Sequence, residues 1–319
     1  MSEQFLLCVI ICTYNRADLL ARTIASLRNQ SVNKSIFEII VVDNCSTDNT
    51  RSLVEELQKA KGLNIQYHYE AHQGLSFARN TGMLCSNARY LLYLDDDIFA
   101  DPGLIQAYLN FLGTSEMVDI ACLGGRVLID WENGQKPDWF PERFLNLYGY
   151  FDLGSTVVKS TYVLGGNMLW KKDILIAFGG FSTDLGRIGH KKLASEETEL
   201  MEKVINSGYE IKYIPGALVH HWTPKERQTR KYLYNMCYWL GISTAISESK
   251  MPMRLSSRLK HILYSLRYIF IVINGFFIAK FDANKTKSAS DLVYFTGKVS
   301  YEHGYLQEWF KMLMGKPLS

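Results

Sequence analysis

The chain opens with blocks of apolar residues separated by amphipathic segments, a pattern that predicts a layered α/β structure. Apolar runs of strand length predict strands that are buried on both faces. The segments 16–30 and 47–61 predict helices, the second with a Ser, Thr and Asp cap cluster and a stop at Gly62. The apolar runs are 5–12 (FLLCVIIC), 37–43 (FEIIVVD) and 88–94 (ARYLLYL).

A further strand at 64–69 and a further helix at 75–87 continue the alternation. Strand and helix follow one another with short links, which is typical of an α/β fold with a Rossmann-like, mostly parallel sheet flanked by helices. In such sheets, ligands bind in the crevice outside the carboxyl ends of the strands.

After residue 119 the pattern is less regular. A strand at 118–129 leads into the Trp- and Pro-rich segment 130–144, for which we weigh a mobile binding loop against a packed surface loop. The segments that follow are a glycine bend, short strand and helix at 163–181, an amphipathic helix with Ser195 as cap and Gly208 as stop, and a strand pair at 209–222. From residue 224 onward the periodicity is helical.

Polar clusters stand directly after three of the expected strands. They are TYNR (13–16), DNCSTD (43–48) and DDD (95–97). Adjacent aspartates repel one another, so either solvent or a divalent cation should neutralise the triplet. Because the clusters should meet at one crevice, we favour the cation, with Asp95 and Asp97 converging through the alternation of an extended segment. The chain contains no GxGxxG after its first strand and no Walker loop, which argues against the usual phosphate loops.

Charge divides the chain into two regions. Residues 1–222 carry 20 Lys and Arg against 26 Asp and Glu, whereas residues 223–319 carry 15 against 6. We therefore expect a catalytic domain at 1–223 and a basic helical region at 224–319. A basic tail can bind nucleic acid, an anionic membrane or a phosphorylated substrate. Of these partners, we do not expect nucleic acid. The apolar run 268–279 would span about 18 Å as a helix, less than the roughly 30 Å of a bilayer core.

The six cysteines form no CxxC pair, which argues against a zinc site and for a reducing compartment. The apolar run 5–12 follows Glu3 rather than basic residues, so it predicts a strand and not a signal peptide. We expect a cytoplasmic protein. For its C-terminal region we weigh a buried helical bundle against attachment to the inner face of the membrane, and the basic residues favour attachment. These are Arg254, Arg258, Lys260, Arg267 and Lys280.

Taken together, the segments resemble glycosyltransferase family 2, the inverting enzymes of GT-A fold. The resemblance covers residues 5–222 and lies in the order of VIICTYNR, FEIIVVDNCSTD, LSFARNTGM, YLLYLDDD, GGNMLW, SEETEL and YIPGALVHHW. It implies a GT-A catalytic domain with a C-terminal helical extension. It also implies Mn²⁺ or Mg²⁺ as cofactor, a UDP-linked sugar donor, and a glycan or lipid-linked glycan as acceptor.

The resemblance also implies residue roles. Glu197 would be the catalytic base, although the family often has Glu-Asp where this chain has Glu196-Glu197, which leaves open which of the two acts. The expected metal ligands are Asp95, Asp97 and His221. Acceptor-side residues would be Gly166, Asn167, Glu196 and Trp222. On the donor side, Thr13 and Tyr14 would line the pocket for the nucleobase, and Asp43 would hydrogen-bond to that base. Arg79 would lie near the sugar or diphosphate, and Asp96 would face the ribose or the donor sugar. Arg16 is a further residue expected to bind the donor.

Two separate acidic clusters suit an inverting transfer. One would serve the departing diphosphate and the other would take the proton of the attacking hydroxyl. The chain supplies such clusters at 95–97 and at 196–197. A nucleotidyltransferase, which also pairs aspartates with a metal, and a non-catalytic carbohydrate-binding or scaffold relative are the alternatives.

Overall fold

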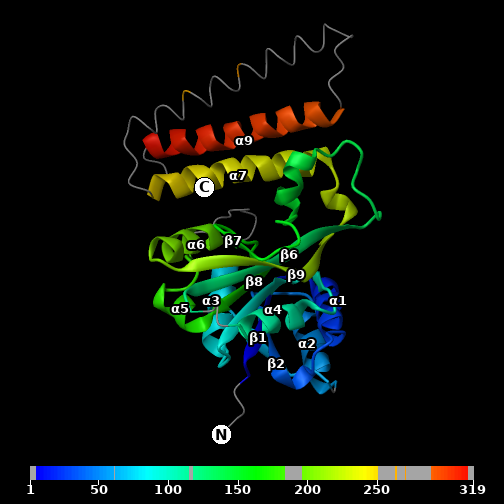
Figure 1. Cartoon of the computed structure of the whole chain (residues 1–319). Helices are drawn as coiled ribbons and strands as arrows, with labels where there is room; N and C mark the ends of the chain where they lie inside the picture. Colours follow the sequence, from blue (N-terminus) through cyan, green and yellow to red (C-terminus); the bar gives the residue numbers. More distant parts are fainter. Residues whose placement is uncertain are drawn as a thin grey trace. The chain divides into compact units, whose positions relative to one another are not determined.

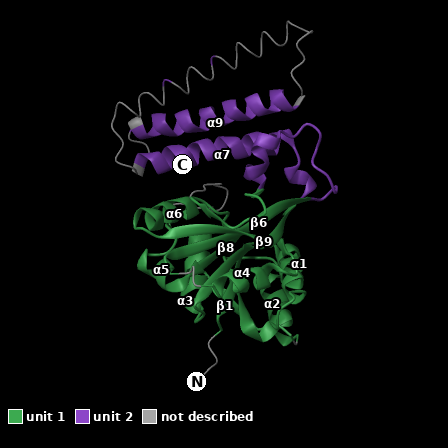
Figure 2. Ribbon diagram, in the orientation of Figure 1, with its two compact units in different colours: residues 1–130, 149–189, 196–222 green, residues 131–148, 190–195, 223–319 purple. Residues whose placement is uncertain are grey.

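The computed structural model describes residues 5–60, 62–114, 118–183, 196–250, 263, 270 and 289–314. They form two compact units (Figure 2). The first consists of Met1–Asp130, Gly149–Gly189 and Glu196–Trp222, and the second of Trp131–Tyr148, His190–Ser195 and Thr223–Ser319. The boundary near residue 223 agrees with the change in charge, whereas residues 131–148 group with the C-terminal residues.

The first unit is built on a mixed sheet in the order β3-β2-β1-β4-β8-β6-β9-β5, with β7 paired to β9. Figure 1 labels β1, β2, β6, β7, β8 and β9 of this sheet. The strands β1 to β4 run parallel, and the remaining pairings for which a register is defined are antiparallel. The strands are β1 (Leu7–Thr13), β2 (Phe37–Asp43), β3 (Ile65–Tyr69), β4 (Tyr90–Asp95), β5 (Ile98–Ala100), β6 (Ile120–Trp131), β7 (Val158–Ser160), β8 (Asn167–Lys171) and β9 (Glu210–Thr223).

Helices cover both faces of this sheet, which explains why its inner parallel strands β1, β2 and β4 are mostly apolar and buried. One core cluster joins α1, α2 and α4 to alternate residues of β1 and β2, such as Val9 and Ile39. A second joins α3, α5 and α6 to the residues between them, such as Ile10 and Ile40. These helices are α1 (Ala17–Arg28), α2 (Thr50–Lys59), α3 (Leu75–Cys85), α4 (Leu104–Leu112), α5 (Lys172–Ala177) and α6 (Glu196–Asn206); the short 3₁₀ helix η1 is Lys34–Ile36.

The expectation of a strand pair at 209–222 is wrong, because β9 is one strand of 14 residues. Its first half pairs with β7 and its second half with β5. Pro215 lacks an N–H but is tolerated between these two partners. The expected cap Ser195, the apolar run 268–279 and the basic residues Arg254, Arg258, Lys260, Arg267 and Lys280 lie outside the described residues.

The second unit contains α7 (Arg230–Lys250), α9 (Ala289–Leu313) and the 3₁₀ helices η3 (Glu142–Tyr148) and η4 (Lys225–Arg227). Glycines let α7 and α9 approach closely: a Cβ at Gly241 would lie 2.0 Å from the Tyr301 carbonyl oxygen, and one at Gly304 would lie 2.1 Å from that of Tyr238. Among the described helices, none combines the length and apolar character that crossing a bilayer requires.

Residues 131–148 form a packed segment rather than an open loop. Trp131 and Phe140 are buried, with ring centroids 5.4 Å apart, and Tyr148 packs edge-to-face on Phe140 at 4.7 Å. The segment also reaches α9, where the rings of Phe144 and Tyr294 lie 5.0 Å apart. The packed loop is therefore what the structure shows, and these aromatic contacts explain why the segment groups with the C-terminal unit.

Candidate active site

The three polar clusters expected at strand ends do meet at one edge of the sheet. Thr13 at the end of β1 pairs in register with Asp43 at the end of β2. On the other side of β1, Cys12 pairs with Asp95 at the end of β4. This edge is the carboxyl end of the parallel strands, where α/β sheets bind ligands.

The acidic triplet is not an extended segment, so the alternation argument for Asp95 and Asp97 is wrong. Asp95 ends β4, and Asp96 and Asp97 form a turn before β5. The turn separates Asp95 from the other two carboxylates, which share Arg16 as a partner. Asp95 is 39% exposed and lies 3.8 Å from Arg79, whereas the side chains of Asp96 and Asp97 are 5% and 4% exposed.

Asp96 is held by the protein rather than presented to a ligand. Its carboxylate accepts hydrogen bonds from Thr13 Oγ1 at 2.8 Å and from Arg16 Nη1 at 2.8 Å. Its backbone carbonyl accepts a hydrogen bond from Thr23 Oγ1 at 2.7 Å. Burial raises the pKa of Asp96 to about 6, and the Arg16 charge opposes that rise. Asp96 thus joins Thr13 and Arg16 in one hydrogen-bonded group, and the contact of these residues with a donor stays a prediction.

Arg16 supplies a positive charge to the aspartate triplet. Its Nη1 lies 3.2 Å from Asp97 Oδ2, so a guanidinium from the N-terminus of α1 bridges two of the three carboxylates. The nearby acidic charges raise the pKa of Arg16 above its ordinary value. One guanidinium offsets one of the three negative charges, so the triplet keeps charge that a divalent cation could neutralise.

Asp97 and His221 come together from distant parts of the chain. Asp97 Oδ1 lies 3.4 Å from His221 Nε2, and the backbone N–H of Trp222 donates to the Asp97 carbonyl at 2.9 Å. Two ligand atoms that bind one cation at about 2.1 Å and at right angles are about 3 Å apart, so this pair fits two ligands of a divalent cation. Among the described residues, no group of three His, Cys, Asp or Glu side chains has the arrangement of a complete metal site.

Asp43 lies in a polar pocket between β2 and the loops beside it. Its carboxylate accepts from Tyr67 Oη at 2.8 Å and from the Ser46 N–H at 2.8 Å. Each oxygen keeps a second lone pair, so the carboxylate can still accept from a nucleobase. The Tyr14 side chain beside this edge is 43% exposed, which suits the expected role in a base pocket.

Asn15 joins the first two strand-end loops and was not among the expected site residues. It has φ 53°, and its Oδ1 accepts from the Thr47 N–H at 2.6 Å, while its own N–H donates to Ser46 Oγ at 2.9 Å. Asn tolerates this left-handed conformation better than most residues, a signal that the sequence did contain.

Arg79 is a buried residue that lies among carboxylates of the site. Its side chain is 3% exposed and its Nη1 lies 2.9 Å from Glu196 Oε1 and 3.1 Å from Glu197 Oε1. The Glu196 side chain is 3% exposed and that of Glu197 is 15% exposed. Burial would raise the pKa of Glu197, but the Arg79 charge and local hydrogen bonds lower it below its ordinary value. Glu197 is therefore ionised at neutral pH and is the more accessible carboxylate of the pair.

Two glycines before β8 make room for these carboxylates. A Cβ at Gly165 would lie 1.9 Å from Glu197 Oε1, and one at Gly166 would lie 2.9 Å from Asp95 Oδ2. The next residue, Asn167, is fully buried; its Nδ2 donates to the Ala217 carbonyl at 2.9 Å and its Oδ1 accepts from Tyr108 at 2.8 Å. Direct contact of Asn167 with an acceptor is thus not supported, because its side chain is used inside the protein.

Trp222 belongs to an aromatic cluster beside the Asp97 turn. The guanidinium of Arg22 lies 4.3 Å from the centroid of Trp222 and 4.4 Å from that of Phe99. The Arg22 guanidinium therefore covers one face of the indole ring. We therefore place Trp222 next to the site through its backbone bond to Asp97, with its ring packed on Arg22.

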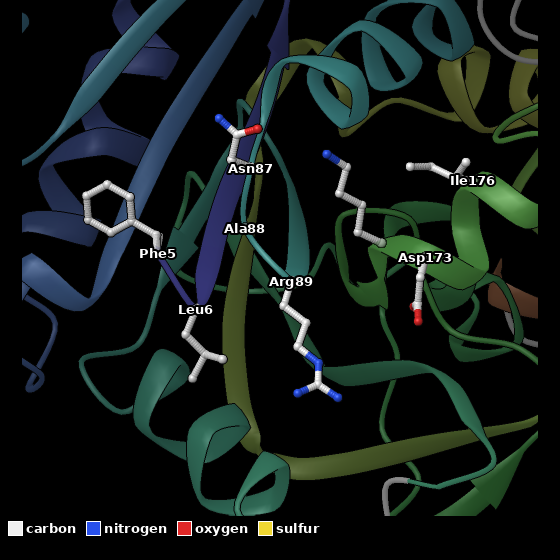
Figure 3. A pocket seen from close by; sticks show the side chains of 8 residues that line it. Phe5, Leu6, Asn87, Ala88, Arg89, Asp173 and Ile176 are labelled. Atoms are coloured by element: carbon white, nitrogen blue, oxygen red, sulfur yellow. The ribbon is translucent and has the colours of Figure 1, made fainter. Parts of the chain in front are cut away.

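The pocket in Figure 3 lies elsewhere. It has a volume of about 580 Å³ and is lined by Phe5, Leu6, Asn87, Ala88, Arg89, Lys172, Asp173 and Ile176. These residues precede β1 and β4 or belong to α5, so the pocket is at the amino ends of the parallel strands. It lacks the acidic clusters and is not the candidate active site.

Comparison with known proteins supports the fold and the family. The family model described as glycosyl transferase family 2 matches residues 8–178. The chain is 25% identical over 251 residues to a glucosyl-dolichyl phosphate glucuronosyltransferase of Haloferax volcanii, covering 76% of this chain and 78% of that protein. It is 28% identical over 260 residues to a chondroitin synthase of Escherichia coli, covering 70% of this chain but 36% of that protein.

Solved structures share the fold at low sequence identity. A mannosyltransferase of Pyrobaculum calidifontis, in complex with GDP-Man and Mn²⁺, matches with a TM-score of 0.63 and 17% identity, covering 99% of this chain and 89% of that one. GalNAc-T7 with UDP, GalNAc and Mn²⁺ matches with a TM-score of 0.54 and 15% identity, covering 100% of this chain and 59% of that one. The GT-A fold expected from the sequence is thereby confirmed.

Proposed function

The chain belongs to glycosyltransferase family 2, and we propose that it moves a sugar from a UDP-linked donor to a hydroxyl group of a glycan acceptor, with inversion and with a divalent cation as cofactor. The observation that carries this proposal is the pairing of two acidic clusters at one sheet edge. Asp95, on the donor side, and Glu197, on the acceptor side, both lie against Arg79.

On the acceptor side, Glu197 is the base. The acceptor oxygen attacks the anomeric carbon, the bond from that carbon to the diphosphate oxygen breaks, and UDP leaves with the electron pair. The hydroxyl proton passes to the Glu197 carboxylate, which is ionised and 15% exposed. Glu196 is more deeply buried and serves as the second anchor of Arg79.

On the donor side, Tyr14 and Asp43 bind the base, and Tyr67 orients the Asp43 carboxylate. Asp97 and His221 would hold Mn²⁺ or Mg²⁺, with Asp95 as a further ligand, and a bound cation would stabilise the charge of the departing diphosphate. Thr13, Arg16 and Asp96 fix the turn that carries Asp97. Gly166 keeps the space beside Asp95 open for substrate.

The acceptor is a glycan of cell-surface or polysaccharide type, in free or lipid-linked form. Support comes from relatives whose names include a glucosyl-dolichyl phosphate acceptor and a chondroitin synthase. We further propose peripheral attachment to an anionic membrane at its cytoplasmic side, because residues 223–319 carry 15 Lys and Arg against 6 Asp and Glu. Flotation with anionic and neutral vesicles at low and high salt tests this attachment.

A donor screen tests the proposed activity. The chain is incubated with UDP-sugars and GDP-sugars, with Mn²⁺ or with EDTA, and the released nucleotide is identified by chromatography. We expect UDP from at least one UDP-sugar in the presence of Mn²⁺ and none in EDTA. Release of pyrophosphate in a parallel incubation with UTP and sugar 1-phosphates would indicate a nucleotidyltransferase instead. Release of GDP alone from the sugar donors would overturn the choice of UDP.

A further inference from the structure

Arg79 is enclosed by three carboxylates and one aromatic ring. Its guanidinium lies 2.9 Å from Glu196 Oε1, 3.1 Å from Glu197 Oε1 and 3.8 Å from Asp95 Oδ1. The ring of Phe181 covers it, with 5.3 Å from Cζ to the ring centroid. A guanidinium with these partners has its donors directed at protein carboxylates rather than at a ligand.

The burial of Arg79 also indicates that its partners are protein carboxylates rather than a ligand. The side chain is 3% exposed, whereas those of Asp95 and Glu197 are 39% and 15% exposed. A nucleotide diphosphate entering at the sheet edge therefore meets the carboxylates first. The Arg79 guanidinium lies deeper in the protein than these carboxylates.

The backbone and neighbours of Arg79 hold it in this position. Tyr93 Oη donates to the Arg79 carbonyl at 3.2 Å. The next residue, Asn80, is bonded to Phe181 twice: its Nδ2 donates to the Phe181 carbonyl at 2.8 Å, and its Oδ1 accepts from the Phe181 N–H at 2.9 Å. These bonds fix both α3 and the ring that covers the guanidinium.

The backbone of Gly165 lies against both Glu197 and Arg79. A Cβ at this residue would lie 1.9 Å from Glu197 Oε1 and 2.7 Å from Arg79 Nη2. The Glu197 carboxylate is thus confined between a guanidinium and a bare backbone. Both contacts restrict the orientation of the group that takes the acceptor proton.

We propose that Arg79 is a positioning residue for the base Glu197, acting from inside the catalytic unit, and not a contact for the donor diphosphate. This inference rests on the proposed function, because it needs Glu197 to be the base. Loss of the guanidinium frees the carboxylate to turn away from the acceptor hydroxyl. A misplacement of this kind costs about 10²-fold in rate.

The first test separates positioning from donor binding. Arg79→Gln and Arg79→Lys are compared with the wild type by calorimetry with UDP and Mn²⁺ and by the kinetics of sugar transfer. We expect an unchanged Kd for UDP, a fall in kcat of about 10²-fold for Arg79→Gln and partial recovery in Arg79→Lys. Lys159→Gln, which breaks the exposed pair with Glu210, is the control and should change neither quantity.

The second test is a double-mutant cycle between Arg79 and Glu197. If Arg79 acts through the base, Arg79→Gln causes no further loss of rate in a Glu197→Gln background. Multiplicative losses, or a weaker affinity for UDP in the Arg79 variants, would overturn the inference. Where Arg79→Gln fails to fold, Arg79→Lys carries the cycle, and Gly165→Ala displaces Glu197 through its added Cβ, with UDP binding expected to persist.

These outcomes differ from a failure of the proposed function. If the wild-type chain releases no nucleotide from any sugar donor, the proposed activity is wrong. If the wild type is active and the Arg79 variants lose UDP binding, the activity stands and the positioning role is wrong.

Discussion

The Arg16 guanidinium lies 2.8 Å from the Asp96 carboxylate, and both groups belong to strand ends that meet at the same edge of the sheet. The same guanidinium reaches Asp97 at 3.2 Å. The acidic turn therefore contains a cation supplied by the chain itself. This arrangement leaves Asp97 Oδ1 directed at His221, 3.4 Å away, which is where a metal would add to the site.

Arg16→Gln should destabilise the chain by about 1–3 kcal/mol, because it leaves two buried carboxylates without their shared cation. The Arg16 side chain is 32% exposed, and water screens part of its charge, so we expect less than for a fully buried pair. Urea unfolding measures the effect. Mn²⁺ should restore more stability to the variant than to the wild type, and equal stability of the two without metal would contradict the assignment.

Binding of UDP should depend on a divalent cation through Asp97 and His221. Asp97→Ala should abolish the part of the UDP affinity that Mn²⁺ supplies, and His221→Ala should weaken it, because each removes one of the two converging ligands. Calorimetry with and without Mn²⁺ measures this. If the wild type binds UDP with the same affinity in Mn²⁺ and in EDTA, UDP binding does not depend on a divalent cation.

The pH dependence of transfer should reflect the low pKa of Glu197. Because that pKa lies below its ordinary value of 4.5, the base stays ionised through neutral pH, and protonation should reduce kcat/KM only as pH falls below 4.5. The same shift stabilises the fold above pH 4.5 and loses its effect as pH falls through the folded pKa.

Arg79→Gln removes the charge that lowers the Glu197 pKa and leaves burial, which raises it. The acid limb of kcat/KM should therefore move to higher pH in this variant. An acid limb at the same pH in both proteins would mean that Glu197 is not the group observed.

Trp131→Ala should act on stability rather than on acceptor affinity. Trp131 is 9% exposed and packs on Phe140 and Tyr148, so its truncation should cost about 3–5 kcal/mol. Trp139 is half-buried and serves as the comparison, with a smaller loss expected. Thermal unfolding and acceptor KM separate the two effects, and a raised KM with unchanged stability in Trp131→Ala would restore the binding-loop interpretation.

Much of the catalytic unit could be predicted from the sequence because its signals are local. Buried parallel strands such as 37–43 and 88–94 are continuous apolar runs, and the polar residues after them necessarily share one edge. The three-residue strands β5 and β7 were missed, because they carry too few residues to show a period.

The interior of the site could not be predicted in the same way. Arg16 and Asp96 are 80 residues apart, and Arg79 and Glu196 are 117 apart, so no local pattern reports these pairs. Motif resemblance places an arginine or an asparagine near a ligand without showing which way its side chain turns. Asn167 and Arg79 turn inward and bond to the protein itself.

The most direct test of the account compares Glu197→Gln with Glu196→Gln under saturating donor and Mn²⁺, measuring both UDP affinity and the rate of sugar transfer. A general base contributes about 10²–10⁴-fold, so Glu197→Gln should lose that factor in kcat while its UDP affinity stays at the wild-type value. Glu196→Gln should retain more of the rate, because Glu196 is buried against Arg79. Transfer near the wild-type rate by Glu197→Gln, with Glu196→Gln inactive, would contradict the account.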